Sequence, residues 1–472
     1  MGVLKQLIKL LRLSRKQKNR WIWSLAAAVI YGITITLPIP ELSFEAHRSL
    51  GVFLVASFLW ATNTLPLAVT GLIVLFLIPV SGALSHEATY GYFGNRAVFF
   101  VLGSFILASP IMRSGLSTRL ALAVVSRFGR NQTALIGAIL FLTATMSFVI
   151  STHAVVAMLF PVVLEVVQAA GAKPGGRFGL AAFLALAWGG SIGGMATLLG
   201  GARAPLALGI MQRTTGANIS FVEWFLWSIP TVALLLMIAY GLLLLIGRGT
   251  AVSLDTALNV LEIRAKTMGG ISRREAVTGL LMFTTIVLWI LKGEAWGLDT
   301  IAFLGVILSF IMRVADWREV EEDVNWGIFV MYGSAIALSA VLRETGAASF
   351  LAQDLLAPLI NSPSVSFIAM VLMTMTLTEG MSNAASVAVL MPVALALANQ
   401  YGIDPRAMTL GITVPSGLAF ILPSSAPAMA IVIGSGYVPP IEALRRGFWL
   451  KVIGFMLFLV MSKLYWPLVG LG

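Results

Sequence analysis

Long apolar stretches separated by short polar and basic segments dominate the chain. Stretches such as 178–200 and 225–246 exceed the roughly 18 mostly uncharged residues that mark a membrane-spanning helix. The pattern predicts about 11 transmembrane helices, and hence an all-α polytopic membrane protein. The expected spans are 21–37, 52–63, 67–82, 97–112, 178–211, 222–246, 275–291, 298–312, 326–342, 408–433 and 448–471.

Two further apolar stretches, 133–167 and 363–400, are each interrupted by polar residues near their middle. Basic residues flank both ends of the first stretch, and such residues mark the cytoplasmic side of a membrane. A segment whose two ends lie on one side cannot cross once, and each arm, at about 15 residues, is too short to cross fully. Both stretches are therefore expected to form re-entrant helical hairpins with polar tips near mid-membrane.

The two hairpins carry a duplicated motif. Residues 151–162 read STHAVVAMLFPV and residues 382–393 read SNAASVAVLMPV, which agree at seven of twelve positions. Gly103-Ser104 recurs as Gly333-Ser334 at nearly the same offset. Because five expected crossings separate the two polar breaks, the second repeat is inverted in the membrane relative to the first. An inverted-topology repeat with a polar break in each half is typical of secondary transporters.

Five segments follow from this pattern, in chain order. They are a basic cytoplasmic segment (1–20), the first spanning helix with an outer loop (21–50), the first repeat with hairpin 133–167 (51–247), a cytoplasmic connector (248–273), and the second repeat with hairpin 363–400 (274–472). The basic N-terminal segment shows no small-residue cleavage site, so the N-terminus is expected in the cytoplasm and the C-terminus outside.

Composition narrows the function classes. Hydrophobic residues make up 58% of the chain and charged residues 11%, and the net charge of +11 comes from basic residues clustered at the ends of spans. This distribution indicates membrane orientation rather than nucleic-acid binding. Cysteine is absent, which excludes disulfides and thiolate metal sites. Three histidines and no paired carboxylates near a break give no catalytic arrangement, so we do not expect an enzyme.

Polar breaks at membrane depth can bind ions. Breaks are expected at Gly193-Gly194 and 200–205 in the first repeat and at 423–427 in the second. A broken helix presents free N–H groups to an anion and free carbonyls to a cation such as Na⁺. Each hairpin tip should meet the broken helix of its own repeat.

Three ionisable residues fall near these breaks. His153 could bond an anionic substrate, exchange a proton, or donate to a backbone carbonyl. Arg203 could pair with an anion or extend to the outer interface. Glu379 could make a structural hydrogen bond or bind a cation or proton.

The tip sequences TMSFVISTHA and TEGMSNAA resemble the divalent anion:sodium symporter family, which carries dicarboxylates, citrate or sulfate. Similar segments are LPLAVT at 65–70, SIGGMATLLG at 191–200, VNWGIF at 324–329 and IVIGSGYV at 431–438. The resemblance implies a scaffold part that forms a homodimer in the plasma (inner) membrane. It also implies a transport part, containing both hairpins, that moves as an elevator.

The resemblance also implies site residues, to which the break adds Arg203. The substrate would contact Ser151, Thr152, His153, Ser382, Asn383, Ala384 and Arg203. One sodium ion would be held by Ser147, Ser151, Thr152 and Gly200, and a second by Thr378, Ser382, Asn383 and Ser425.

The chain departs from the family's Ser-Asn-Thr tips. Thr152 and His153 replace Asn and Thr in the first tip, and Ala384 replaces Thr in the second, so sodium is expected more at the second site than at the first.

The leading hypothesis is sodium-coupled symport of a small divalent anion, either dicarboxylate or sulfate. The alternative, favoured by His153 and Arg203, is a proton-coupled or exchange carrier, or an efflux pump, for an inorganic oxyanion. The expected partners are the anion, sodium ions, the lipid bilayer and a second copy of the chain, with no nucleic acid.

Overall fold

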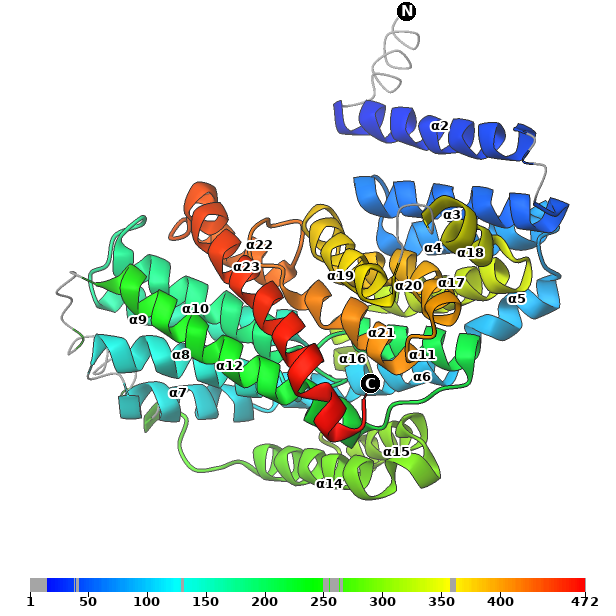
Figure 1. Cartoon of the computed structure of the whole chain (residues 1–472). Helices are drawn as coiled ribbons and strands as arrows, with labels where there is room; N and C mark the ends of the chain where they lie inside the picture. Colours follow the sequence, from blue (N-terminus) through cyan, green and yellow to red (C-terminus); the bar gives the residue numbers. More distant parts are fainter. Residues whose placement is uncertain are drawn as a thin grey trace, which may run out of the picture.

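The computed structural model describes residues 15–37, 39, 42–128, 131–248, 254, 263, 266–356 and 362–471. Within these ranges all regular secondary structure is helical (Figure 1). Eight described helices are long and apolar enough to cross a membrane, judged by length and composition. Residues 1–14 of the expected basic segment, and most of the expected connector 248–273, lie outside the described residues.

The first half begins with α2 (Arg15–Thr36) and continues with the helices of the first repeat. These are α3 (Phe44–Thr62), α4 (Leu67–Ser81), α5 (His86–Phe93), α6 (Arg96–Arg113), α7 (Leu116–Phe128), α8 (Gln132–Met146), α9 (Thr152–Ala169), α10 (Arg177–Gly193), α11 (Arg203–Thr215) and α12 (Phe221–Gly247).

The second half repeats this order. Its elements are α14 (Arg273–Trp296), α15 (Leu298–Ile311), α16 (Trp317–Asp323), α17 (Trp326–Glu344), α18 (Ala347–Phe350) with the π-helix η1 (Leu351–Leu356), α19 (Pro363–Gly380), α20 (Asn383–Tyr401), α21 (Pro405–Thr413) with the 3-10 turn η3 (Pro415–Gly417), α22 (Pro427–Gly434), α23 (Pro440–Leu464) and the 3-10 turn η4 (Trp466–Val469). Helices α15, α16 and α20 begin 231 residues after α4, α5 and α9, and α17 begins 230 after α6. The duplication therefore extends well beyond the tip motifs.

Local sequence explains many helix boundaries. Asn95 and Asn325 occupy equivalent positions before α6 and α17, and each side chain accepts a hydrogen bond from the first turn, at 2.8 and 3.1 Å. Such caps satisfy N–H groups that have no partner inside the helix. The equivalent caps show that the repeat is preserved at the level of individual helix starts.

Several elements differ from the sequence expectation. The short helices α5, α7 and α16 form where loops were expected, α3 begins at Phe44 inside the expected outer loop, and the last long helix begins at Pro440 rather than 448. In α7, Arg119 donates to Glu275 Oε1 (2.8 Å) and to the carbonyl of Gly269 (2.9 Å). Part of the expected basic loop is thus a helix held against the start of α14.

The two repeats interlock rather than stand side by side. Helix α4 packs on α17 of the other repeat, and α6 packs on α15. A Cβ at Gly71 would lie 2.5 Å from Ser334 Oγ, and one at Gly103 would lie 2.7 Å from the Cβ of Ala302. The duplicated Gly-Ser pairs therefore lie at the two helix crossings, where small residues allow close approach.

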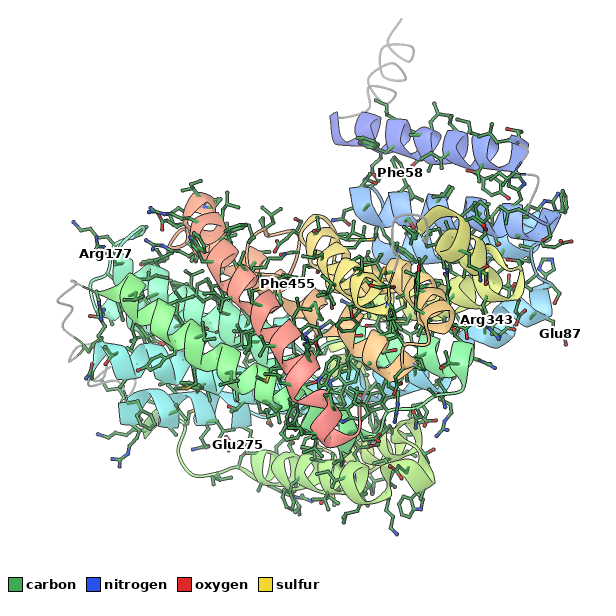
Figure 2. All side chains as sticks on the ribbon, viewed as in Figure 1. Phe58, Glu87, Arg177, Glu275, Arg343 and Phe455 are labelled. Carbon is green, nitrogen blue, oxygen red and sulfur yellow. The ribbon has the colours of Figure 1, made fainter. Side chains whose placement is uncertain are left out.

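Hairpin α8–α9 lies at the left of the view and hairpin α19–α20 nearer its middle, with α19–α22 drawn between the α8–α10 group and the α3–α4 group (Figure 1). Charged side chains mark the two ends of the bundle, with Arg177 at one end and Glu87 and Arg343 at the other (Figure 2). Polar ends flanking an apolar middle are what a protein spanning a bilayer requires.

Candidate functional site

A cavity of about 360 Å³ lies where both hairpin tips and both helix breaks meet. The first turns of α4 and α17, and Phe105 of α6, complete its wall. The tip residues lining it are Ser151, Thr152, His153, Ser382, Asn383 and Ala384, and the break residues include Gly200, Arg203 and Ser425. Of the sequence-predicted site residues, Ser147 and Thr378 do not line the cavity but are buried.

The first tip is bonded to the break between α10 and α11. The backbone N–H of Thr152 donates to the carbonyl of Gly200 at 3.0 Å, and its Oγ1 lies 2.9 Å from the same oxygen. Oγ1 also lies 3.0 Å from the carbonyl of Gly190. The tip thus meets the broken helix of its own repeat, as the sequence predicts.

Two serines of the first repeat keep their hydroxyls free. Ser151 precedes α9, but its side chain makes no capping hydrogen bond. Ser147 is fully buried, and its Oγ has no partner among the described residues. Both hydroxyls are therefore available to a ligand.

The second tip is organised around Thr378. Its Oγ1 lies 2.7 Å from Asn383 Oδ1 and 3.0 Å from the carbonyl of Ser416. Ser382 caps α20 by accepting from the N–H of Ala385 at 3.3 Å. Ser425 Oγ donates to the carbonyl of Leu422 at 2.6 Å. Hydroxyl, amide and backbone oxygens therefore gather beside this tip.

The break of the second repeat is longer than the sequence suggested. Helix α21 ends at Thr413, η3 follows, and α22 begins only at Pro427. Ser416, whose carbonyl joins the Thr378 group, was missed because the expected break began at 423. The signal for it is present in Pro415 and Gly417, two helix-breaking residues that flank it.

Arg203 is the first residue of α11 and lines the cavity. Its exposed fraction is 6%, so it does not extend to an interface. Among the described residues no carboxylate lies within ion-pair distance of it, and its buried Nη2 donates no hydrogen bond. Burying an unpaired charge is costly, so a guanidinium in this setting lacks the counter-charge that buried charges usually have.

Other polar groups complete the cavity. His153 lines it from the first turn of α9. Ser191, near the end of α10, also lines it, and its buried Oγ has no partner among the described residues. Sequence analysis missed Ser191 because it lies inside the last turn of α10, just before the expected break at Gly193-Gly194.

A second cavity, of about 290 Å³, lies at the starts of α6 and α15. Its lining residues Gly297, Leu298 and Asp299 are the repeat counterparts of Pro66, Leu67 and Ala68 in the first cavity, and Ala97 is the counterpart of Gly327. Arg96 and Asp299, which both line it, form an ion pair at 3.1 Å. The two cavities are thus bordered by equivalent parts of the two repeats.

Comparison with known proteins assigns this chain to a family. Residues 18–471 match the model of the sodium:sulfate symporter transmembrane region. The chain belongs to the sodium:sulfate symporter family. It is therefore an integral, multi-pass membrane protein, as the apolar helices also indicate.

Relatives in this family include named transporters. The sodium-dependent dicarboxylate transporter SdcS of Staphylococcus saprophyticus is 27% identical over 454 residues, covering 89% of this chain and 87% of that protein. SdcS of Staphylococcus aureus is 26% identical over 456 residues, covering 91% and 88%. These names agree with the expected class, a transporter rather than an enzyme.

Two solved structures share the fold. Neisseria gonorrhoeae MtrF, from a study of a class of antimetabolite efflux pumps, aligns with a TM-score of 0.62 and 15% identity over 89% of this chain and 98% of that one. The Alcanivorax borkumensis YdaH transporter aligns with a TM-score of 0.57 and 16% identity over 97% and 99%. At such identities the likeness establishes the architecture alone.

Proposed function

We propose that this member of the sodium:sulfate symporter family is a secondary active transporter that couples sodium to the uptake of a small divalent anion, a dicarboxylate or sulfate. The observation that carries the proposal is the buried, unpaired guanidinium of Arg203 in the cavity between the two tips. The free hydroxyl of Ser151 and the start of α9 add donors for the same anion.

A sodium ion fits the oxygen group of the second repeat. Asn383 Oδ1 and the carbonyl of Ser416 each lie within hydrogen-bond distance of Thr378 Oγ1. Unwound carbonyls and polar side chains at helix breaks are the ligands that transporters of this kind use for sodium. Ser382 and Ser425, on the same side of the cavity, would complete the set.

The paired cavities support an elevator-type alternating-access mechanism. The scaffold part would comprise α2–α6 and α14–α17, and the transport part α8–α12 and α19–α23. If the transport part moves so that the repeats exchange their scaffold contacts, the tips leave Pro66–Ala68 and come to lie against Gly297–Asp299. Each cavity would then mark the position of the same binding site in one of the two states of the transport cycle.

The setting of the transporter is also proposed. The basic residues at the N-terminus support a cytoplasmic position for that end in a plasma (inner) membrane, and the odd number of expected crossings would put the C-terminus outside. A homodimer formed by the scaffold parts would hold them still while the transport parts move.

One observation favours a second candidate, a proton-coupled or exchange carrier, or an efflux pump, for an inorganic oxyanion. His153 lines the cavity at the position of an uncharged tip residue in the family, and histidine is the side chain that most readily exchanges a proton near neutral pH.

Counterflow in proteoliposomes tests both candidates, with succinate, citrate and sulfate as probes and with Na⁺ and pH varied separately. The leading proposal expects uptake of at least one anion that requires Na⁺, and an unchanged pH dependence in His153→Ala. Uptake that follows the proton gradient without Na⁺, and loses its pH dependence in His153→Ala, would favour the second candidate. Absence of uptake and binding for every anion would reject both.

A further inference from the structure

The equivalent tip positions Thr152 and Asn383 carry opposite hydrogen-bonding functions. The Thr152 hydroxyl lies against two backbone carbonyls, those of Gly190 and Gly200, to which it can only donate. The Asn383 amide instead presents its oxygen, which accepts from Thr378 at 2.7 Å. A cation needs acceptors, so the second tip offers sodium an amide oxygen that the first tip lacks.

Among the other predicted sodium ligands of the first repeat, the carbonyl of Gly200 is engaged with the tip. The carbonyl of Gly200 accepts from the N–H of Thr152, and the single hydroxyl proton of Thr152 can be donated either to this carbonyl or to that of Gly190. The carbonyl of Gly190 also accepts from the N–H of Gly194 at 2.9 Å. Apart from Thr152 and these carbonyls, the predicted first site offers a cation the hydroxyls of Ser147 and Ser151, and it has no amide oxygen corresponding to Asn383 Oδ1.

A fixed positive charge already stands beside these residues. The Arg203 guanidinium lies between the two breaks: a Cβ at Gly201 would be 3.1 Å from its Nη1, and one at Gly417 would be 2.7 Å from its Nη2. Inside a protein, a charge this close attracts an anion more strongly than it would in water, and it supplies a positive charge beside both breaks without a bound cation.

We infer that Arg203 takes the place of one coupling cation, so that a single sodium ion, bound at the second-repeat oxygen group, accompanies each divalent anion. The inference rests on the proposed function and specifies its coupling. One guanidinium and one sodium ion balance the two negative charges of the anion. If the occupied binding site carries no net charge, the transport part can move it through the low-dielectric membrane at the least electrostatic cost.

Equilibrium binding of radioactive sodium and of radiolabelled succinate and sulfate to the purified protein tests the inference. The expected result is one sodium ion per bound anion and a sodium dependence with a Hill coefficient of about 1. Asn383→Ala should abolish sodium binding. Arg203→Met should weaken anion binding roughly 10- to 100-fold at saturating sodium, because a charge-assisted bond is lost.

Two further variants separate charge from geometry. Arg203→Lys keeps the charge, so it should keep one sodium ion per anion with a smaller loss of anion affinity. Arg213→Met, on the exposed last turn of the same helix, is the matched control and should bind both ions as the natural chain does. Melting temperatures of all variants establish that they are folded.

Two sodium ions per anion in the natural chain would overturn the inference while leaving the proposed function standing. So would anion binding by folded Arg203→Met as tight as that of Arg213→Met. Failure of the natural chain to bind any of the anions would instead overturn the proposed function, and the inference with it.

Discussion

Lys451 Nζ lies 2.7 Å from Glu379 Oε1, joining the middle of α23 to the end of α19. Both side chains are largely buried, with exposed fractions of 10% and 13%. Glu379 also accepts from the N–H of Leu422 (3.1 Å) through Oε2, and its carbonyl accepts from Ser424 Oγ (2.9 Å). Of the roles that the sequence left open for Glu379, these contacts favour the structural one, which holds the second helix break beside its tip.

Lys451→Met should therefore destabilise the protein markedly. It leaves the Glu379 carboxylate buried without its counter-charge, a change that typically costs about 3–5 kcal/mol. Thermal unfolding in detergent measures the loss. The double variant Lys451→Met/Glu379→Gln should recover part of it, since no charge is then left unpaired.

Lys463→Met, on the exposed last turn of the same helix, is the control and should be nearly neutral. If Lys451→Met has the same melting temperature as Lys463→Met, and the double variant shows no coupling, the Lys451–Glu379 ion pair contributes nothing to stability.

Filling the second cavity should separate binding from transport. Val222 lines that cavity and is 36% exposed, so Val222→Trp can add volume there without entering the core. We expect uptake to slow roughly tenfold because the hairpin tips can no longer move to the second cavity, while equilibrium anion binding stays unchanged.

Leu226→Trp, one turn further along α12 and exposed, is the matched control for this cavity and should leave uptake unaffected. Undiminished uptake by Val222→Trp would show that the second cavity is not visited during the cycle.

The two tip serines should differ in how they tolerate alanine. Ser382 caps α20, so Ser382→Ala should cost about 0.5–2 kcal/mol of stability. Ser151 makes no capping bond, so Ser151→Ala should leave stability unchanged but weaken anion binding roughly 3- to 10-fold through one lost hydrogen bond. Melting curves and binding isotherms of both variants check this. The reverse order of stability losses would contradict the assigned roles.

Asp323, at the end of α16, is expected to contribute to the stability of the fold in a pH-dependent way. Burial acts to raise its pKa, but hydrogen bonds from Arg113 (2.8 and 2.9 Å) and Ser109 (2.6 Å) outweigh it and leave the pKa below its usual value. A group with a lowered pKa stabilises the fold above its unfolded pKa of about 3.9, and this stability is lost as the pH falls through the folded pKa.

Asp323→Asn should thus lower the melting temperature at pH 7, and its difference from the natural chain should shrink as the medium is acidified below the unfolded pKa. Glu322→Gln removes a neighbouring but exposed ion pair with Arg113 and should change little. Equal effects of the two variants at every pH would indicate that the buried bonds of Asp323 add nothing.

The sequence by itself determined the elements and their duplication. Spans can be read from it because a helix in lipid needs about 20 apolar residues, and breaks can be read because glycine, proline and hydroxyl residues interrupt helices locally. The hairpins, the tips at Ser151 and Ser382, and the break before Arg203 all follow from such local signals. Short helices such as α5 and α16 did not, because they are too short to give a hydropathy signal.

Tertiary structure alone decided what these elements contact. The pattern left Arg203 free to face an anion or an interface, and only packing placed it, buried and unpaired, between breaks from both repeats. Glu379 meets Lys451 across 72 residues, and the two cavities match only because the repeats interlock. Hydropathy reports a residue's preference for lipid or water, whereas partners are chosen by distances between segments that are remote in the chain.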